Sequence, residues 1–387
     1  MEGFFDESVC LCALNKVFGY TPKAGLALYR HAGSAGAVFR IPPAGLAQLL
    51  GPYADHAEQL GKEALRDAAR ELDETAACGA RFIPFGAQDY PALLLECEDP
   101  PLGLYYKGVS PPEAVFDGRP AIAIVGTRKV TSYGREWCRR IVRALADTGE
   151  KPLIVSGLAY GTDGIAHIAA LDYGLPTAGV MATGIDAVYP WQHRELARRI
   201  AQTPGCALLT DYPLRTAPVA LNFIRRNRII AGLCQATLVI ESATRGGSLI
   251  TARYANDYSR DVFALPGRID DGRSAGCNRL IQEKMADIIA DPESLAERLG
   301  LGRPKRRNRA ELIGALRKRY GGTLPPDRLE ILLETAATVR DRRDLTAEEI
   351  AARNGRSYTL VAEAAALLAA DGIIEPDLLQ RYSIPAK

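Results

Sequence analysis

Four short loops that follow apolar runs combine glycine with Ser, Thr or Arg. They contain Gly126-Thr127-Arg128, Ser156-Gly157, Thr183-Gly184 and Arg245-Gly246-Gly247-Ser248. Glycine lets backbone N–H groups approach a ligand closely, and hydroxyl and guanidinium groups bind anions. Any one loop could equally be an ordinary strand-to-helix turn. Four such loops together favour a phosphate-binding site, provided that the fold brings them to one edge.

A basic segment from Asn222 to Ile230 is the second candidate. At about 100° per residue, Arg225 and Arg228 fall about 60° apart on one face of a helix, where guanidinium groups suit successive phosphates. Arg226 falls on the apolar side and is expected to be a structural arginine paired with an acid. Phe223 offers a face on which a base can stack, or is an ordinary core aromatic at a helix start.

Residue patterns for catalysis are weak. Asp163 and His167 stand four residues apart, and a helix-capping Asp with a core His is favoured over an acid/base pair. The sequence has no Gly-x-Ser-x-Gly elbow, Walker lysine loop or metal-ligand motif. The glycines after Val125 do not follow the Gly-x-Gly-x-x-Gly spacing of a dinucleotide site. We therefore expect neither an enzyme nor a bound cofactor or metal.

The segment 80–300 must position these loops, and in it short apolar runs alternate with helical patterns. Strands buried on both faces are continuously apolar, which predicts an extended Rossmann-like, doubly wound, mostly parallel α/β sheet. Ligands of such sheets bind beyond the carboxyl ends of the strands. The predicted strands are 121–125, 153–155, 177–181, 207–209, 236–240 and 262–265, and the predicted helices are 134–147, 165–172, 192–202, 223–233, 248–258 and 278–283.

Three further regions flank this segment. Residues 1–75 predict a small helical, SAM-like domain with helices at 9–18, 25–31, 42–49 and 54–72. Residues 301–325 contain a basic run and turn residues, which predicts a linker. Residues 326–387 give helix, turn, helix and then a tight turn into a strand at 373–374, which suggests a winged-helix-like domain.

The composition excludes several classes of protein. The chain has 387 residues, and 48 Lys and Arg against 46 Asp and Glu leave a net charge of +2, so any nucleic-acid surface must be a local patch. A hydrophobic share of 47% is that of a folded protein. The eight cysteines form no Cys-x-x-Cys pair. No signal peptide or membrane-spanning run is evident, so we expect a reduced, cytoplasmic protein.

Seven ordered motifs strongly resemble the DNA-processing protein A family (DprA, also called Smf). They are IVGTR (124–128), SGLAYGTDGIAH (156–167), ATGIDAVYP (182–190), NFIRRNRIIAGL (222–233), ESATRGGSLITA (241–252), ALPG (264–267) and GCNRLI (276–281). Four positions depart from the family pattern: Ile224 replaces proline, Gly246 replaces serine, and Lys284-Met285 replaces Gly-Ala.

The resemblance implies a non-catalytic protein of natural transformation. Such proteins bind incoming single-stranded DNA without sequence preference, protect it, form homodimers through the Rossmann-like domain and load the recombinase RecA. Together with the loop arginine, the resemblance makes these residues the predicted DNA-binding set: Gly126, Thr127, Arg128, Ser156, Gly157, Phe223, Arg225, Asn227, Arg228, Arg245, Gly247 and Ser248.

Two other functions fit the same fold. Rossmann-like nucleotide phosphoribohydrolases use a Pro-Gly-Gly-x-Gly-Thr-x-x-Glu loop, but Arg253 stands here where the catalytic glutamate would be. A winged-helix regulator would need a basic recognition helix. The second helix of the tail, 357–370, contains Glu363 and many alanines but no Lys or Arg, so we expect the tail to serve partner contact or stability.

Overall fold

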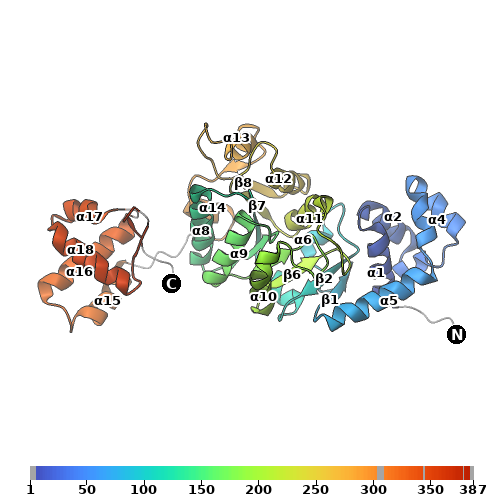
Figure 1. The fold of residues 1–387 in the computed structure, drawn as a ribbon, viewed down its shortest axis with the longest axis horizontal. Coiled ribbons are helices and arrows are strands. Elements are labelled where there is room, and N and C mark those ends of the chain that lie inside the picture. Colours follow the sequence, from blue (N-terminus) through green and yellow to red (C-terminus); the bar gives the residue numbers. More distant parts are fainter. Residues whose placement is uncertain (1–5, 303–308, 343–344, 378, 384–387) are drawn as a thin grey trace. The chain divides into compact units, whose positions relative to one another are not determined.

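The chain divides into two compact units, Met1–Pro304 and Lys305–Lys387. The computed structural model describes residues 6–302, 309–342, 345–377 and 379–383 (Figure 1). Among these residues, no helix is both long and apolar enough to cross a lipid bilayer. The cysteines are free thiols; seven are buried and Cys78 is half-buried, as small core residues would be.

The first unit begins with a helical region. Its elements are α1 (Glu7–Phe18), α2 (Pro22–Ala32), α3 (Ala35–Val38), α4 (Pro43–Leu50), the 3₁₀ helix η1 (Gly51–Gln59) and α5 (Lys62–Ala77). The single mixed helix expected over 54–72 is wrong. Gly61 is extended, with φ −126° and ψ −176°, and it separates η1 from α5. The helical periodicity on either side of Gly61 concealed this break.

A nine-stranded sheet follows, in the order β1-β2-β6-β5-β4-β3-β7-β8-β9. The neighbours from β6 to β9 pair in parallel, which confirms the predicted mostly parallel α/β fold. The strands are β1 (Arg81–Pro84), β2 (Gly103–Lys107), β3 (Ala121–Val125), β4 (Leu153–Ser156), β5 (Thr177–Val180), β6 (Ala207–Thr210), β7 (Ala236–Val239), β8 (Asp261–Ala264) and β9 (Asp287–Ile288).

Three of these strands were missed by the sequence analysis. The strands β1 and β2 form an antiparallel edge beside β6, and β9 adds two residues at the other edge. In β1, Ile83 is buried, Arg81 is exposed, and Phe82 and Pro84 are half-buried, as expected of an edge strand. The strands β1 and β9 therefore lack the continuous buried run by which the central strands were found, whereas β2 was missed although it is buried from Gly103 to Tyr106.

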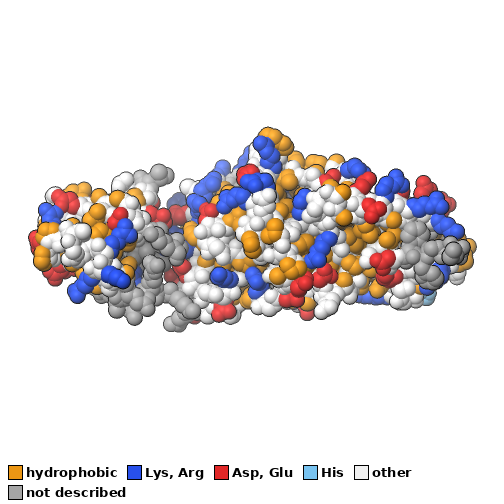
Figure 2. All heavy atoms as spheres, turned by 90° about the horizontal axis from the view of Figure 1, so that it is seen from below, with side chains coloured by type: hydrophobic (Ala, Val, Ile, Leu, Met, Phe, Trp, Pro, Cys, Tyr) orange, Lys and Arg blue, Asp and Glu red, His pale blue; other side chains and the backbone are white. Residues whose placement is uncertain are grey.

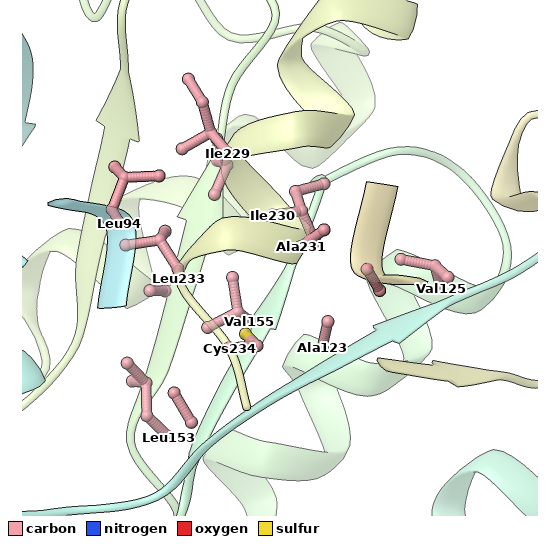
Figure 3. Packing of buried hydrophobic residues seen from close by; sticks show 14 of the residues in the cluster. Leu94, Ala123, Val125, Leu153, Val155, Ile229, Ile230, Ala231, Leu233 and Cys234 are labelled. Carbon is pink, nitrogen blue, oxygen red and sulfur yellow. The ribbon is translucent and has the colours of Figure 1, made fainter. Parts of the chain in front are cut away.

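Helices cover both faces of the sheet because successive strand residues point to opposite sides. Ala123 and Val125 of β3 belong to one hydrophobic cluster, and Ile122 and Ile124 belong to another. Figure 3 shows the first cluster, in which Ile230 and its neighbours face the strands. The helices of this part are α6 (Ala92–Leu95), α7 (Pro112–Phe116), α8 (Ser132–Asp147), α9 (Thr162–Asp172), η2 (Trp191–His193), α10 (Arg194–Gln202), α11 (Ala220–Gly232), α12 (Ser248–Asp257), α13 (Ala275–Gln282) and α14 (Pro292–Arg298).

The strand order reverses at β3, which pairs with β4 on one side and β7 on the other. The chain connections therefore diverge from this strand. In an open α/β sheet, such a reversal leaves a crevice beyond the carboxyl ends of the strands, where ligands bind. The topology thus places the loops after β3, β4 and β7 around one position.

The second unit consists of α15 (Arg309–Tyr320), α16 (Pro326–Asp341), α17 (Ala347–Asn354), α18 (Tyr358–Ala370) and a hairpin of β10 (Glu375–Pro376) and β11 (Tyr382–Ser383). The structure differs from the sequence prediction of a linker over 301–325. Residues 303–308 lie outside the described residues, but α15 is a helix whose Leu312, Leu316 and Tyr320 join the core of this unit. Its interspersed arginines and lysine concealed that apolar face.

Charged side chains are mixed on the molecular surface. On the face drawn in Figure 2, basic, acidic and apolar side chains are interspersed, in keeping with the near-neutral net charge. A nucleic-acid site on this chain therefore depends on local geometry rather than on a broad basic field.

Candidate nucleic-acid interface

A cavity of about 530 Å³ lies where the loops after β3, β4 and β7 meet the start of α11. Its lining combines glycines and hydroxyl residues with an aromatic and basic rim, the combination expected of a phosphate-binding site. The lining residues are Val125, Gly126, Thr127, Arg128, Ala159, Asp163, Tyr189, Pro218, Ala220, Phe223, Ile224, Arg226, Asn227, Ile230, Ser242, Ala243, Gly246, Gly247, Ser248 and Thr251.

The loops after β3 and β4 interlock at the floor of this cavity. The Thr162 backbone N–H donates to the Thr127 carbonyl at 3.2 Å. A Cβ on Gly126 would lie 2.4 Å from Thr162 Oγ1, closer than real Cβ contacts occur. Gly161 has φ +76°, in the left-handed region, and a Cβ there would lie 2.3 Å from the Thr127 carbonyl oxygen. Two glycines therefore permit the approach that fixes Thr127 and Arg128.

A buried arginine joins α11 to the loop after β4. Arg226 Nη1 donates to the Gly157 carbonyl at 2.7 Å and also to the Val180 carbonyl. Asp163 Oδ2 accepts the Gly157 N–H at 3.1 Å. Burial lowers the pKa of Arg226 to about 10, although the Asp163 carboxylate opposes this shift. Arg226 therefore remains cationic near neutral pH and holds the loop, the structural role that its helical phase predicted.

Three side chains form the aromatic rim. The guanidinium carbon of Arg128 lies 4.9 Å from the centroid of the Phe223 ring. The Tyr189 ring packs edge-on against Phe223, with centroids 5.4 Å apart. Phe223 is half-buried and Arg128 is exposed. Cationic and aromatic groups in such contact are the features with which proteins stack bases and bind phosphates of single strands.

The loop after β7 and the start of α12 complete the cavity. Asn227 Nδ2 donates to the Gly247 carbonyl at 3.3 Å, and Ser248 Oγ donates to Ser242 Oγ at 2.9 Å. A Cβ on Gly247 would meet nothing within 4 Å, and its φ of −62° is open to any residue. The fold therefore does not require glycine at 247, whereas close approach of a ligand would.

The structure brings seven of the twelve predicted DNA-binding residues into the lining of this cavity. They are Gly126, Thr127, Arg128, Phe223, Asn227, Gly247 and Ser248. The other five, Ser156, Gly157, Arg225, Arg228 and Arg245, do not line it. Of these, Arg245 is exposed beside the lining residue Gly246.

Two predicted contact residues are buried and engaged elsewhere. Arg228 is only 5% exposed; its Nη2 pairs with Asp211 Oδ2 at 2.7 Å, and its Nη1 donates to the Asp99 carbonyl. Ser156 is fully buried and donates to the Ile124 carbonyl at 2.6 Å. The prediction that these two side chains contact DNA is therefore wrong, because a phosphate cannot reach them without breaking these bonds.

Gly157 is also a structural residue. A Cβ there would lie 2.6 Å from Arg226 Nη2 and 2.7 Å from Asp163 Oδ2. Gly157 is therefore required by the packing of Arg226 and Asp163, and the structure places it beneath the cavity lining rather than in it.

Arg225 is held by the helical region of the same unit. Its guanidinium carbon lies 4.5 Å from the centroid of the Tyr20 ring, and its Nη1 donates to the Tyr20 carbonyl. Tyr20 Oη in turn donates to Asn222 Oδ1 at 2.9 Å. The side chain stays partly exposed beside the cavity. Sequence analysis missed Tyr20, because nothing in the local pattern of α1 and α2 points to residues 200 positions away.

The third glycine loop does not join the cavity. Thr183 is buried, and its Oγ1 donates to the Ala187 carbonyl at 2.6 Å, so this loop folds on itself. The same motif nevertheless contributes Tyr189, which sequence analysis quoted within ATGIDAVYP but did not select. An aromatic residue beside proline in the loop that follows β5 was the available signal.

The Asp163 and His167 pair is structural. His167 is fully buried, and its Nδ1 lies 2.7 Å from Thr177 Oγ1. Burial lowers the pKa of His167 to about 3. Asp163 accepts hydrogen bonds from the backbone N–H groups of Gly157 and Ala159 in the preceding loop. The prediction that it caps α9 is therefore wrong. Among the described residues, no three His, Cys, Asp or Glu side chains gather as metal ligands would.

Comparison with known proteins places this geometry in a family. A profile of the family described as DNA recombination-mediator protein A matches residues 81–300, more than half of the chain. The chain is 41% identical over 225 residues to a protein named Smf from Synechocystis, covering 58% of this chain and 56% of that protein. It is 39% identical over 219 residues to DNA processing protein DprA of Streptococcus pneumoniae, covering 56% and 74%. The match thus spans only about half the length of the Synechocystis relative.

Solved structures agree. The X-ray structure of DNA processing protein A from S. pneumoniae superimposes with a TM-score of 0.62 at 31% identity, covering 74% of this chain and 95% of that one. A structure of DNA processing protein A from Helicobacter pylori, solved to describe the single-stranded DNA binding mode of that protein, gives a TM-score of 0.50 at 29% identity, covering 56% and 95%. The matched residues include every loop of the cavity, and the chain belongs to the DNA recombination-mediator protein A family.

Proposed function

We propose that the chain binds single-stranded DNA in this cavity without sequence preference and breaks no bond there. The observation that carries the proposal is the pairing of Arg128 with the Phe223 ring beside a lining of glycines and hydroxyl groups. The guanidinium and backbone N–H groups suit phosphate oxygens, and the ring suits a base of any identity. The single-stranded DNA binding mode described for the related H. pylori protein supports this ligand.

The proposed role in the cell rests on the family. We propose that the protein protects incoming single-stranded DNA during natural transformation, acts as a homodimer and loads the RecA recombinase. The family description as recombination mediator and the DprA relatives support this proposal. Its test is strand exchange by RecA on DNA coated with single-strand binding protein, which the chain should accelerate.

No observation favours the phosphoribohydrolase alternative. Among the described residues that line the cavity, Asp163 is the one carboxylate, and two backbone N–H groups already bind it. Cleavage of an N-glycosidic bond needs a carboxylate free to stabilise an oxocarbenium-like state. Incubation with nucleoside monophosphates should therefore release no free base.

We also propose that the second unit serves partner contact or stability rather than single-strand binding. Arg356, the half-buried base directly after the turn residue Gly355, donates to the Glu334 carboxylate through Nε and Nη2, both at 2.8 Å. The helix α18 contains no Lys or Arg. Arg356→Ala should accordingly leave single-strand affinity unchanged.

The central experiment is fluorescence anisotropy with labelled single- and double-stranded oligonucleotides across a salt series. We expect tighter binding of the single strand and a linear fall of log K with log salt. Arg128→Ala should reduce that slope by about 0.7, the loss of one phosphate contact. Arg70→Ala is the matched control, because Arg70 is an exposed arginine of α5 that pairs with Asp67. An Arg128→Ala protein with an unchanged slope would contradict the proposal.

A further inference from the structure

An exposed tryptophan lies just beyond the aromatic rim. Trp191 begins η2 and is 66% exposed, although a side chain of this size normally buries most of its apolar surface in a folded chain. The guanidinium carbon of Arg194 lies 3.7 Å from the centroid of the Trp191 ring. Among the described residues no carboxylate forms an ion pair with Arg194, whereas the neighbouring Arg198 pairs with Glu195.

The segment that carries this pair is continuous with the cavity. Tyr189 lines the cavity, and the Cα of Trp191 lies two residues further, no more than about 7 Å away. On the other side, the Tyr160 hydroxyl bonds Gln192, and the Tyr160 ring lies 5.3 Å from the ring of His193. Tyr160 follows Ala159, which lines the cavity as well. The segment that contains Trp191 therefore begins at the cavity lining and contacts Tyr160, the neighbour of a second lining residue.

The same segment borders a second hollow. A cavity of about 430 Å³ is lined by Arg194 and Arg198 of α10, by Lys107 of β2 and by Asp186 and Val188 of the loop before Tyr189. The segment from Asp186 to Arg194 thus contributes lining residues to both cavities, and the stacked pair of Trp191 and Arg194 belongs to this segment. A polyanion leaving the first cavity in this direction would meet positive charge.

We propose that Trp191 and Arg194 form a second base-stacking platform, on which the DNA strand held at Phe223 continues by one or two nucleotides. The proposal rests on the function proposed above. A base stacks on the face of the Trp191 ring that Arg194 leaves free, and the guanidinium contacts the adjoining phosphate. The platform lengthens the binding site, so its contribution depends on the length of the oligonucleotide.

Fluorescence tests this platform directly. The chain has two tryptophans, Trp137 and Trp191, so Trp137→Phe leaves Trp191 as its single tryptophan. This variant is titrated with oligothymidylates of increasing length, and the anisotropy of an end-labelled oligonucleotide gives total binding in parallel. We expect Trp191 emission to be quenched only by oligonucleotides longer than those that saturate the Phe223 site. Binding without any quenching would overturn the proposal.

Affinity measurements on the chain with Trp137 intact supply an independent readout. Trp191→Ala should weaken binding of long oligonucleotides about 5- to 20-fold, in the lower part of the range for a stacked base, and leave short ones unaffected. Trp191→Phe should restore most of the loss. Tyr53→Ala is the matched control, because Tyr53 is an exposed aromatic of η1. Equal affinities for Trp191→Ala and the unmodified chain, or a Trp191→Ala effect on oligomeric state alone, would refute the platform.

These outcomes separate the two proposals. If neither the unmodified chain nor the Trp191→Ala variant binds single strands in the anisotropy assay, the proposed function fails, and the platform fails with it. If the chain binds single strands and Arg128→Ala reduces the salt slope as expected, but Trp191→Ala leaves the affinity unchanged, only the platform fails.

Discussion

The guanidinium carbon of Arg128 lies 4.9 Å from the centroid of the Phe223 ring, so a loop residue after β3 contacts the first turn of α11. The two residues are 95 positions apart and meet only because β3 lies where the strand order reverses. In the proposed function, this contact joins a group that binds phosphate to a group that stacks a base. Removing the arginine and removing the ring should therefore change DNA binding in different ways.

Phe223→Ala should weaken single-strand binding by about 1–3 kcal/mol without changing the salt slope, because stacking releases no counterions. Phe223→Tyr should retain most of the affinity. Anisotropy titrations at several salt concentrations check both variants. A Phe223→Ala protein whose slope falls as that of Arg128→Ala does would show that the ring only positions the arginine.

Gly247→Ala should lower single-strand affinity while the free energy of unfolding changes by less than about 1 kcal/mol, because a Cβ at 247 meets no atom of the fold. Gly126→Ala should instead destabilise the protein by about 1–3 kcal/mol, since its Cβ would lie 2.4 Å from Thr162 Oγ1. Urea unfolding and anisotropy distinguish the pair. Undiminished affinity in Gly247→Ala would remove 247 from the binding surface.

Arg228→Met should cost about 3–5 kcal/mol of stability, because the Asp211 carboxylate would be left buried without its partner. The double variant Arg228→Met with Asp211→Asn should recover part of that loss. Urea denaturation measures both. A stable Arg228→Met protein with weakened DNA binding would instead restore Arg228 to the contact set.

Acidification should destabilise the first unit through His167. Its pKa is lowered from 6.5 to about 3 by burial, so the folded state favours the neutral ring. The stability that the neutral His167 ring gives the folded state is fully present above pH 6.5 and is lost as the pH falls from 6.5 towards 3. At pH 5 the free energy of unfolding should be lower by about 2 kcal/mol for this reason. His167→Asn, which keeps an amide near the position of Nδ1, should flatten the pH dependence of urea stability over that window. If stability falls equally with pH in His167→Asn and in the unmodified chain, another group causes the acid sensitivity.

The central strands and the position of the site could be predicted from the sequence. The strand at 121–125 was predicted with its observed bounds because both of its faces are buried and every residue is apolar. Loops that follow parallel strands meet at one edge, so Gly126, Arg128 and Gly247 could be placed together before their contacts were known. These inferences depend only on local pattern and general topology.

The roles of individual arginines could not be predicted in the same way. Helical phase put Arg228 with Arg225 on an exposed face, yet Asp99 and Asp211 cover Arg228, and Tyr20 packs on Arg225. The covering groups come from segments up to 205 residues away in the sequence. A helical wheel contains no information about such partners, so burial of one face had to come from the structure.

The helical region is bonded to the same stretch of chain that supports α11. Asn15 Nδ2 donates to the Asp211 carbonyl at 2.8 Å, and the Glu71 carboxylate accepts the Leu214 N–H at 2.6 Å. Asp211 also neutralises Arg228. The helices of the first 77 residues and the parallel sheet should therefore melt in one cooperative calorimetric transition. Neither part can unfold without breaking hydrogen bonds that the other part makes.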